Sequence, residues 1–238
     1  MQPHNQPMVS IGNFFFRYRN QLFPVIFVLG VIVVSTGYHA SWLGLGLGVA
    51  MLGQLVRAAV IGLAYIKRGG MNKKVYAENL VTSGIFGVCR NPLYVGNILI
   101  ILGLLLVAGS PLLLLVGSIV FGFIYQCIIY AEETYLLEKF GSAYQDYCQD
   151  VPRWIPNFSQ LHSATEGMQF NLSRVIAKDY STFFGWLGWV VAIILYQHYL
   201  DGKPLSDTAN SPLFYIILAG GMLALLVRVL KKKKILKV

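Results

Sequence analysis

The sequence predicts an all-α integral membrane protein with about six transmembrane helices. The first observation behind this prediction is composition. Of 238 residues, 56% are hydrophobic and only 12% are charged, whereas soluble domains carry roughly 25% charged residues. The second is a series of apolar runs close to the roughly 20 residues that a membrane-spanning helix needs. These runs cover residues 22–38, 42–66, 93–109, 112–130, 183–200 and 213–230.

The first two runs each have a feature that bears on how they lie in the membrane. Arg17 and Arg19 precede the run at 22–38, as in a signal peptide, but no convincing cleavage site follows, so we expect a retained span. The run at 42–66 would be roughly 37 Å long as a helix. This exceeds the hydrocarbon core and predicts a tilt or a protruding end.

The third and fourth runs are separated only by Gly109-Ser110-Pro111, which predicts a tight turn and a helical hairpin. Beyond the fourth run, apolar residues continue at helical spacing, so we expect that helix to leave the membrane and to bend at Gly141. Residues 170–180 are expected to form an interfacial amphipathic turn before the fifth run.

Lysine and arginine residues fall almost entirely on one side of the predicted helices. With both chain ends placed inside, the outer loops hold only Lys203. Positive charge concentrates on the cytoplasmic side of membrane proteins. We therefore expect both termini to be cytoplasmic, and the net charge of +9 to face anionic membrane lipids rather than nucleic acid. The inner segments hold Arg17, Arg19, Lys67, Arg68, Lys73, Lys74, Arg90, Lys139, Arg153, Arg174, Lys178, Lys231, Lys232, Lys233, Lys234 and Lys237.

The three cysteines, Cys89, Cys127 and Cys148, are widely separated, and no Cys or His pair has the spacing of metal ligands. The sequence therefore predicts free thiols, no disulfide and no structural metal.

Arg90, Asn91 and Pro92 come directly before the third apolar run. Proline suits the first turn of a helix, and helix starts expose unpaired N–H groups that attract anions. Arg90 adds a full positive charge at the same place, so a site for an anionic group is one interpretation. A snorkelling arginine beside an ordinary helix-start proline is the other.

Glu132 and Glu133 lie where the fourth helix leaves the membrane, and the hairpin brings them to the same side as Arg90. Acidic residues near hydrocarbon are costly and usually functional. The alternative is a helix-end pair bridged to a neighbouring arginine. Arg153 and Trp154 fit either acceptor binding or an interfacial anchor.

Arg57 lies inside the second run, with Gln54 one turn away and no charge partner in that run. We expect its side chain to point into the helix bundle at a polar group. A structural role and a functional role are equally open.

Two motifs follow each other in the chain: LVTSGxFxxxRNPxYxG from Leu80 to Gly96, and EExxLxxxFGxxYxxYxxxVPRWIP from Glu132 to Pro156. This ordered pair resembles the isoprenylcysteine carboxyl methyltransferase family, which is related to the membrane phospholipid N-methyltransferases. The resemblance implies a single membrane domain over 1–238. Within it, a methyltransferase core would cover 40–157, and an interfacial segment plus two extra transmembrane helices would cover 158–238.

The resemblance further implies an enzyme that depends on S-adenosyl-L-methionine, with a cytoplasm-facing cofactor pocket formed by the loops around the third and fourth helices. A lipophilic acceptor, a lipid or a lipidated substrate, would enter from the bilayer. Arg90, Arg153 and Glu133 would form the catalytic set, with the two arginines orienting the acceptor. Cofactor contacts would fall on Glu78, Asn79, Leu80, Val81, Phe86, Asn91, Pro92, Leu93, Tyr94 and Glu132.

The chemistry of these residues suits that cofactor. Helix-start amides and Arg90 suit its carboxylate, Glu132 suits a cationic or hydroxyl group, and Phe86 and Tyr94 offer aromatic faces. No glycine-rich Rossmann fingerprint is present, which argues against a methyltransferase domain of the soluble type.

Three positions depart from the family pattern: Asn91 stands where His is common, Phe86 where Tyr is common, and Ile128 where an acceptor-facing Arg stands. Asn keeps hydrogen-bonding capacity and Phe keeps the ring, so we expect cofactor binding to survive. Ile128 removes a cation. A prenylated carboxylate and a phospholipid amine of the phosphatidylethanolamine type therefore both stay open as acceptors.

Two other functions are compatible with the sequence. One is an NADPH-dependent sterol reductase, because such reductases share a similar helical core. The other is a non-enzymatic transporter or structural membrane protein, which would tolerate Glu132→Gln and Tyr94→Ala. The oligomeric state is left open.

Overall fold

The computed structural model describes residues 6–34, 40–63, 75, 77–203 and 212–232. Most of these residues are helical and none of them forms a strand, so the predicted all-α class is confirmed. The elements are α1 (Gln6–Val34), α2 (Ala40–Leu63), η1 (Gly84–Gly87), α3 (Pro92–Val107), α4 (Pro111–Phe140), α5 (Ser142–Asp150), η2 (Phe158–Gln160), α6 (Leu161–Thr165), α7 (Leu172–Leu200) and α9 (Pro212–Lys232).

Four of these helices, α1, α2, α4 and α7, are long and apolar enough to cross a membrane by length and composition. α3 is also apolar but has 16 residues. Each of the six predicted runs lies on one of α1, α2, α3, α4, α7 and α9, apart from residues 108–109, which form the turn after α3, and residues 35–38 and 64–66, which lie outside the described residues. The presence of several apolar helices indicates a multi-pass integral membrane protein, while a count of six spans remains a prediction.

Two helices begin well before the predicted position. α1 begins at Gln6 instead of residue 22, because Val9, Gly12 and Phe16 form a buried face on its first turns. A Cβ at Gly12 would lie 1.9 Å from the Cys127 carbonyl oxygen, so α1 and α4 approach closely there.

α7 begins at Leu172, and the predicted interfacial turn at 170–180 was wrong because this segment is the start of one continuous helix of 29 residues. The Asn171 side chain caps it by accepting a 2.8 Å hydrogen bond from the Arg174 N–H. Ala177 and Asp179 on these first turns are buried, so packing extends the helix beyond the apolar run.

Glycines let α2 and α3 pack with their backbones in contact. A Cβ at Gly53 would lie 2.6 Å from the Gly96 carbonyl oxygen, and a Cβ at Gly46 would lie 2.6 Å from that of Gly103. Small residues permit such close approach between membrane helices. Gly96 also makes room for the alkyl part of Arg57, which would lie 2.6 Å from a Cβ at position 96. The pair α2 and α3 is thus a tightly packed frame on which the start of α3 is held.

The predicted α3–α4 hairpin and the bend after α4 are both confirmed. Between the two helices, Gly109 has a φ of 75° and the Ser110 hydroxyl accepts a 3.3 Å hydrogen bond from the Leu113 N–H. At the other end, α4 stops at Phe140 and Gly141 has a φ of 55° before α5 begins. The left-handed backbone at these two positions favours glycine.

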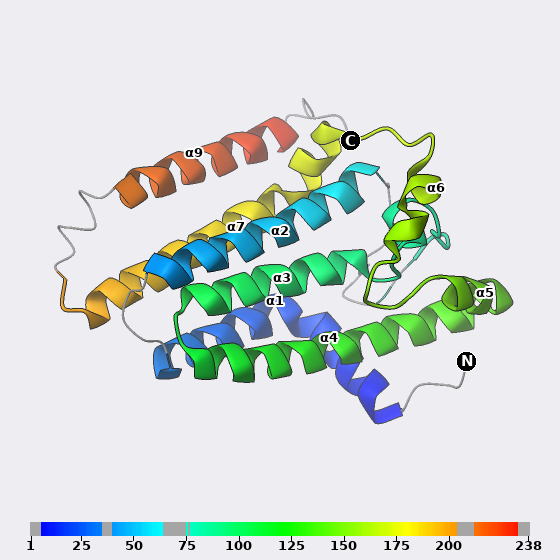
Figure 1. Cartoon of the computed structure of the whole chain (residues 1–238), viewed down its shortest axis with the longest axis horizontal. Helices are drawn as coiled ribbons and strands as arrows, with labels where there is room; N and C mark the ends of the chain where they lie inside the picture. Colours follow the sequence, from blue (N-terminus) through cyan, green and yellow to red (C-terminus); the bar gives the residue numbers. More distant parts are fainter. Residues whose placement is uncertain (1–5, 35–39, 64–74, 76, 204–211, 233–238) are drawn as a thin grey trace.

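Figure 1 shows α5, α6 and the stretch 77–91 gathered at one end of the bundle, where α3 begins and α4 ends. Two backbone hydrogen bonds join the segment before α3 to the segment after α5: Arg90 N–H to the Pro152 carbonyl at 2.9 Å, and Asn157 N–H to the Val88 carbonyl at 2.9 Å. The two predicted motifs therefore meet at this end. α9 packs along α7 on the outside of the bundle.

Candidate functional site

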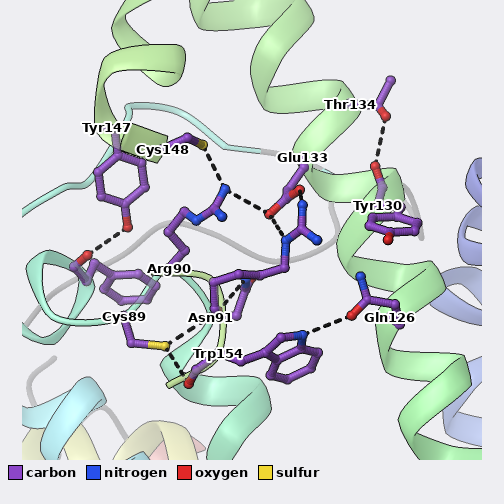
Figure 2. A network of polar contacts seen from close by, with 12 residues as sticks. Cys89, Arg90, Asn91, Gln126, Tyr130, Glu133, Thr134, Tyr147, Cys148 and Trp154 are labelled. Carbon is purple, nitrogen blue, oxygen red and sulfur yellow. Dashed lines mark hydrogen bonds and ion pairs between the residues drawn. The ribbon is translucent and has the colours of Figure 1, made fainter. Parts of the chain in front are cut away.

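Glu133 is the centre of a buried ion cluster at the end of the bundle where the two motifs meet. Its carboxylate is 2% exposed and accepts hydrogen bonds from Arg153 Nε at 2.9 Å and Arg153 Nη2 at 2.8 Å. Arg90 Nη1 lies 3.2 Å from the same carboxylate (Figure 2). The structure therefore brings together all three residues that the sequence assigned to the catalytic set. For Glu133, the structure also shows an ion pair with neighbouring arginines, which was the alternative interpretation of the paired acids.

This cluster carries an excess of positive charge, because two guanidinium groups face one carboxylate. Arg90 is 9% exposed, and its Nε is buried without a hydrogen-bond partner among the described residues. Burial by itself lowers the pKa of Arg90, but the Glu133 carboxylate, helped by Cys148 and Tyr144, raises that pKa above its ordinary value. Arg90 therefore stays charged, and its Nε–H can donate a hydrogen bond to a group bound beside the start of α3.

Cysteine thiols line the cluster. Arg90 Nη1 donates to Cys148 Sγ at 2.9 Å, while the buried Cys89 thiol lies 3.5 Å and 3.3 Å from the carbonyl oxygens of Arg153 and Trp154 (Figure 2). Burial raises the pKa of Cys89, and the Asn91 backbone and Arg90 offset only part of that rise. Cys89 is therefore a neutral thiol that donates to the backbone. Cys89, Cys127 and Cys148 are all free.

The start of α3 is fastened to the second motif. The Asn91 side chain donates to the Arg153 carbonyl at 3.2 Å rather than capping the helix, and Pro92 occupies the first helical position. The Trp154 indole N–H donates to the Gln126 side chain at 2.9 Å, and the Arg153 guanidinium lies 5.2 Å from the Tyr130 ring centre. These contacts hold residues 153–154 against α4.

Glu132 points at a different partner from its neighbour Glu133. The Tyr94 hydroxyl donates a 2.6 Å hydrogen bond to Glu132 Oε1, and the Tyr94 ring lies 5.3 Å from that of Tyr125. Glu132 is 7% exposed. The paired acids therefore divide: Glu133 binds the two arginines, whereas Glu132 faces the first turn of α3.

The remaining predicted cofactor residues fall into separate surroundings. Phe86 is buried with Val60, and Val81 and Leu93 pack against that pair. The Phe86 carbonyl accepts a 2.7 Å hydrogen bond from Tyr147.

The other members of that predicted set lie toward the surface. Leu80 packs with the α4–α5 cluster that contains Leu136 and Tyr144. Glu78 and Asn79 are exposed. The contacts therefore group Asn91, Pro92 and Tyr94 with the acids, and Glu78 and Asn79 lie on the surface.

A second polar cluster lies between α2, α3 and α7, where Arg57 points into the helix bundle at polar groups, as the sequence predicts; its acid, Asp179, was not predicted. Asp179, 1% exposed, accepts hydrogen bonds from Arg57 Nε at 3.1 Å and from Gln54 Nε2 at 2.7 Å. Arg57 also donates to Asn97 and, at 3.2 Å, to Thr182. An acid next to an apolar run was the available signal, but the sequence predicts a surface turn for that segment.

An open cleft of about 470 Å³ lies between η1, α5 and the residues around α6. Asp146, Asp150, Thr82 and Ser163 supply polar groups to its lining. Among the residues that the structure describes, no group of three or more His, Cys, Asp or Glu side chains could hold a metal ion.

Comparison with known proteins places the chain in a family. A family model described as phospholipid methyltransferase matches residues 36–143, which include Arg90, Tyr94, Glu132 and Glu133. No solved structure matches the chain.

Three curated relatives are similar to the chain. It is 29% identical over 156 residues to the nickel-cobalt-cadmium resistance protein NccN of Alcaligenes xylosoxydans xylosoxydans, covering 64% of this chain and 71% of that protein. It is 31% identical over 157 residues to the cobalt-zinc-cadmium resistance protein CzcN of Cupriavidus metallidurans, covering 63% and 69%. It is 33% identical over 116 residues to the protein-S-isoprenylcysteine O-methyltransferase of Schizosaccharomyces pombe, covering 46% and 48%. The ordered motifs, the family model and these relatives agree, and the chain belongs to the isoprenylcysteine carboxyl methyltransferase-like family of membrane methyltransferases.

Proposed function

We propose that this protein is an S-adenosyl-L-methionine-dependent methyltransferase that transfers a methyl group to a membrane-embedded lipid or lipidated substrate. The observation that carries the proposal is the buried cluster of Arg90, Glu133 and Arg153 beside the Tyr94–Glu132 hydrogen bond. Family membership favours this function over the reductase and transporter functions that the sequence left open.

The residues present fit the proposed cofactor. Arg90 Nε is a buried donor without a partner among the described residues, and it lies beside the start of α3. Arg90 Nε and the N–H groups of that helix start together suit a carboxylate. Glu132 suits a hydroxyl or cationic group, and Tyr94 and Phe86 suit an aromatic or cationic one. When bound, the cofactor supplies an electrophilic methyl group.

We assign the cofactor contacts to the residues predicted from the sequence, which come from two stretches of the chain. Those at the α3 start and on α4 are Asn91, Pro92, Leu93, Tyr94 and Glu132. The preceding loop would contribute Glu78, Asn79, Leu80, Val81 and Phe86.

Methyl transfer is an in-line displacement that depends on alignment and on exclusion of water. Glu133 serves alignment, because its two oxygens hold both arginines in a fixed arrangement. Arg90 and Arg153 would then orient the acceptor with the charge that Glu133 leaves unbalanced. The hydrogen bond from Trp154 to Gln126 holds the segment that carries Arg153 against α4.

The position of the two arginines favours a carboxylate acceptor over an amine. Ile128, which stands at the family's acceptor-facing Arg position, is fully buried among Phe16 and Ile124 and supplies no charge. Arg90 and Arg153 supply it instead, because both guanidinium groups gather at Glu133, while Glu132 is turned to Tyr94. Guanidinium groups pair with a carboxylate rather than with an ammonium group. We therefore propose a lipidated carboxylate as the acceptor, with a phospholipid amine as the second candidate.

We further propose six membrane spans, with both termini and the site on the cytoplasmic side, and the core at 40–157 followed by an accessory region at 158–238. Supporting this topology, the described end that holds α5 and α6 carries Arg90, Lys139 and Arg153, whereas Lys203 follows the opposite end of α7. Lys67, Arg68, Lys73, Lys74, Lys233, Lys234 and Lys237 lie outside the described residues.

The first test is binding of S-adenosylhomocysteine to the purified protein in detergent, measured by calorimetry. Wild type should bind, Glu132→Gln should lose most of the affinity while staying folded, and Glu138→Gln should behave as wild type because Glu138 is an exposed acid on the same helix. Absence of binding to well-folded wild type would overturn the proposal. Transfer of labelled methyl groups to a prenylcysteine analogue, compared with phosphatidylethanolamine vesicles, then decides the acceptor.

A further inference from the structure

α7 supplies the acid of a buried ion pair to the methyltransferase core, although the family match ends before α7 begins. Asp179 is 1% exposed and binds the guanidinium of Arg57 on α2. Gln54, one turn away on α2, donates to the same carboxylate at 2.7 Å, and Trp186 donates to Gln54 at 3.1 Å. A buried carboxylate with this many donors is held in one position.

Another nitrogen of the Arg57 guanidinium, Nη1, is directed toward the candidate site. Arg57 Nη1 donates to Asn97 Oδ1 on α3, and Asn97 hydrogen-bonds the Tyr125 hydroxyl on α4. The Tyr125 ring packs at 5.3 Å against the ring of Tyr94. Tyr94 in turn donates to Glu132 at 2.6 Å. A continuous set of contacts therefore runs from α7 through α2, α3 and α4 to the wall that we assign to the cofactor.

Charge balance separates this cluster from the one around Glu133. Arg57 is matched one to one by Asp179, so it leaves no net charge with which to attract an anionic acceptor. α7 is also held to the bundle by a second buried contact, from Gln197 Nε2 to the Val107 carbonyl of α3 at 2.9 Å. The Arg57–Asp179 pair is therefore not the sole polar contact that docks α7 among the described residues.

We propose that Arg57, clamped by Asp179, is a positioning residue that holds Asn97 and Tyr125 and thereby sets the Tyr94 ring with its hydroxyl on Glu132. α7 is then a working part of the methyltransferase site. The consequence for cofactor binding rests on the function proposed above, whereas the effect on Tyr94 does not.

The test compares Asp179→Asn with Gln197→Leu, which breaks a buried hydrogen bond between α7 and α3 away from the site. Two readouts are made on each full-length protein in detergent. One is the affinity for S-adenosylhomocysteine together with KM and kcat of methyl transfer. The other is the ¹⁹F resonance of 3-fluorotyrosine incorporated at position 94, which reports the surroundings of that hydroxyl without any ligand.

We expect Asp179→Asn to weaken S-adenosylhomocysteine binding about tenfold and to shift or broaden the fluorine resonance, with Gln197→Leu changing neither. Asp179→Glu should restore part of the affinity. The double variant Arg57→Gln with Asp179→Asn removes both charges together. It should show the same loss as Asp179→Asn, and it decides the question if the single variant does not fold.

An unshifted resonance and wild-type affinity in the folded Asp179→Asn protein would overturn the inference. So would equal effects of Asp179→Asn and Gln197→Leu, which would reduce the ion pair to a helix-docking contact. If wild type binds no S-adenosylhomocysteine, the proposed function fails. The fluorine resonance alone then decides whether Asp179 positions Tyr94.

Discussion

Tyr94, on the first turn of α3, donates a 2.6 Å hydrogen bond to Glu132 near the end of α4. These two residues come from the two separate motifs. Their contact closes the hairpin at the end where Arg90, Glu133 and Arg153 also meet.

Removing the Tyr94 hydroxyl should impair the site without unfolding the protein. Tyr94→Phe keeps the ring contact with Tyr125 but removes the hydrogen bond from position 94 to Glu132. A hydrogen bond to a charged group contributes about 1.5–3 kcal/mol. We therefore expect S-adenosylhomocysteine affinity to fall by about tenfold or more. Calorimetry on Tyr94→Phe checks this, with Tyr199→Phe as the control because Tyr199 is 74% exposed. Unchanged affinity in Tyr94→Phe would contradict the prediction.

Glu133→Gln should cost more stability than any other single acid-to-amide change on α4. It leaves two guanidinium groups without their carboxylate, one of them 10% exposed and the other 25%. Breaking a buried ion pair from one side typically costs about 3–5 kcal/mol. The unfolding temperature in detergent should drop clearly for Glu133→Gln and stay within about a degree or two of wild type for the exposed Glu138→Gln. Equal unfolding temperatures for the two variants would show that the cluster does not stabilise the fold.

Gly53→Leu should disrupt the α2–α3 pair, because even a Cβ at Gly53 would lie 2.6 Å from the Gly96 carbonyl oxygen. Overpacking of this kind costs about 1–3 kcal/mol or more. Gly48→Ala is a control on the same helix, since a Cβ there meets nothing within 4 Å. Folded yield on size-exclusion chromatography should fall for Gly53→Leu alone. A monodisperse Gly53→Leu protein with wild-type yield would mean that the two backbones do not pack this closely.

The buried Cys89 thiol predicts a specific loss of stability at high pH. Because burial raises its pKa in the folded protein above the ordinary value of 9.0, the unfolded chain releases this proton first. The contribution is therefore fully present below pH 9.0 and is lost as pH rises through the raised pKa of the folded state.

Cys89→Ser keeps a donor for the Arg153 and Trp154 carbonyls but does not titrate in this range. We expect the unfolding temperature of wild type to fall more steeply than that of Cys89→Ser above pH 9.0. Parallel curves for the two proteins across that range would count against a buried neutral thiol.

The features that could be predicted from the sequence depend on neighbouring residues. Gly109, Pro111 and Gly141 mark turns through their own backbone preferences, so the hairpin and the bend after α4 were predicted correctly. The starts of α1 and α7 depend instead on burial against distant helices, which apolar runs do not report. Both were placed too late in the chain.

Part of the candidate site could likewise be predicted from local features of the sequence. Arg90 and the paired acids stood out because charge next to an apolar run is unusual, and the structure brings them together. The division of roles between Glu132 and Glu133 could not be predicted, since it depends on where two side chains point. Asp179 was missed because its partner Arg57 lies 122 positions earlier in the chain.

The Arg57–Asp179 pair also has a consequence for the order of assembly during synthesis. A chain growing at about 5–20 residues per second adds the 122 intervening positions over roughly 6–24 seconds. Throughout that interval α2 carries a guanidinium without its counter-charge. Because Arg57 lies toward the C-terminal end of α2, the cost to membrane insertion is below the roughly 2.5–3.5 kcal/mol that a charge at a helix centre carries. The ion pair can form only once α7 has been synthesised, so the polar cluster between α2, α3 and α7 is completed after most of the chain has been made.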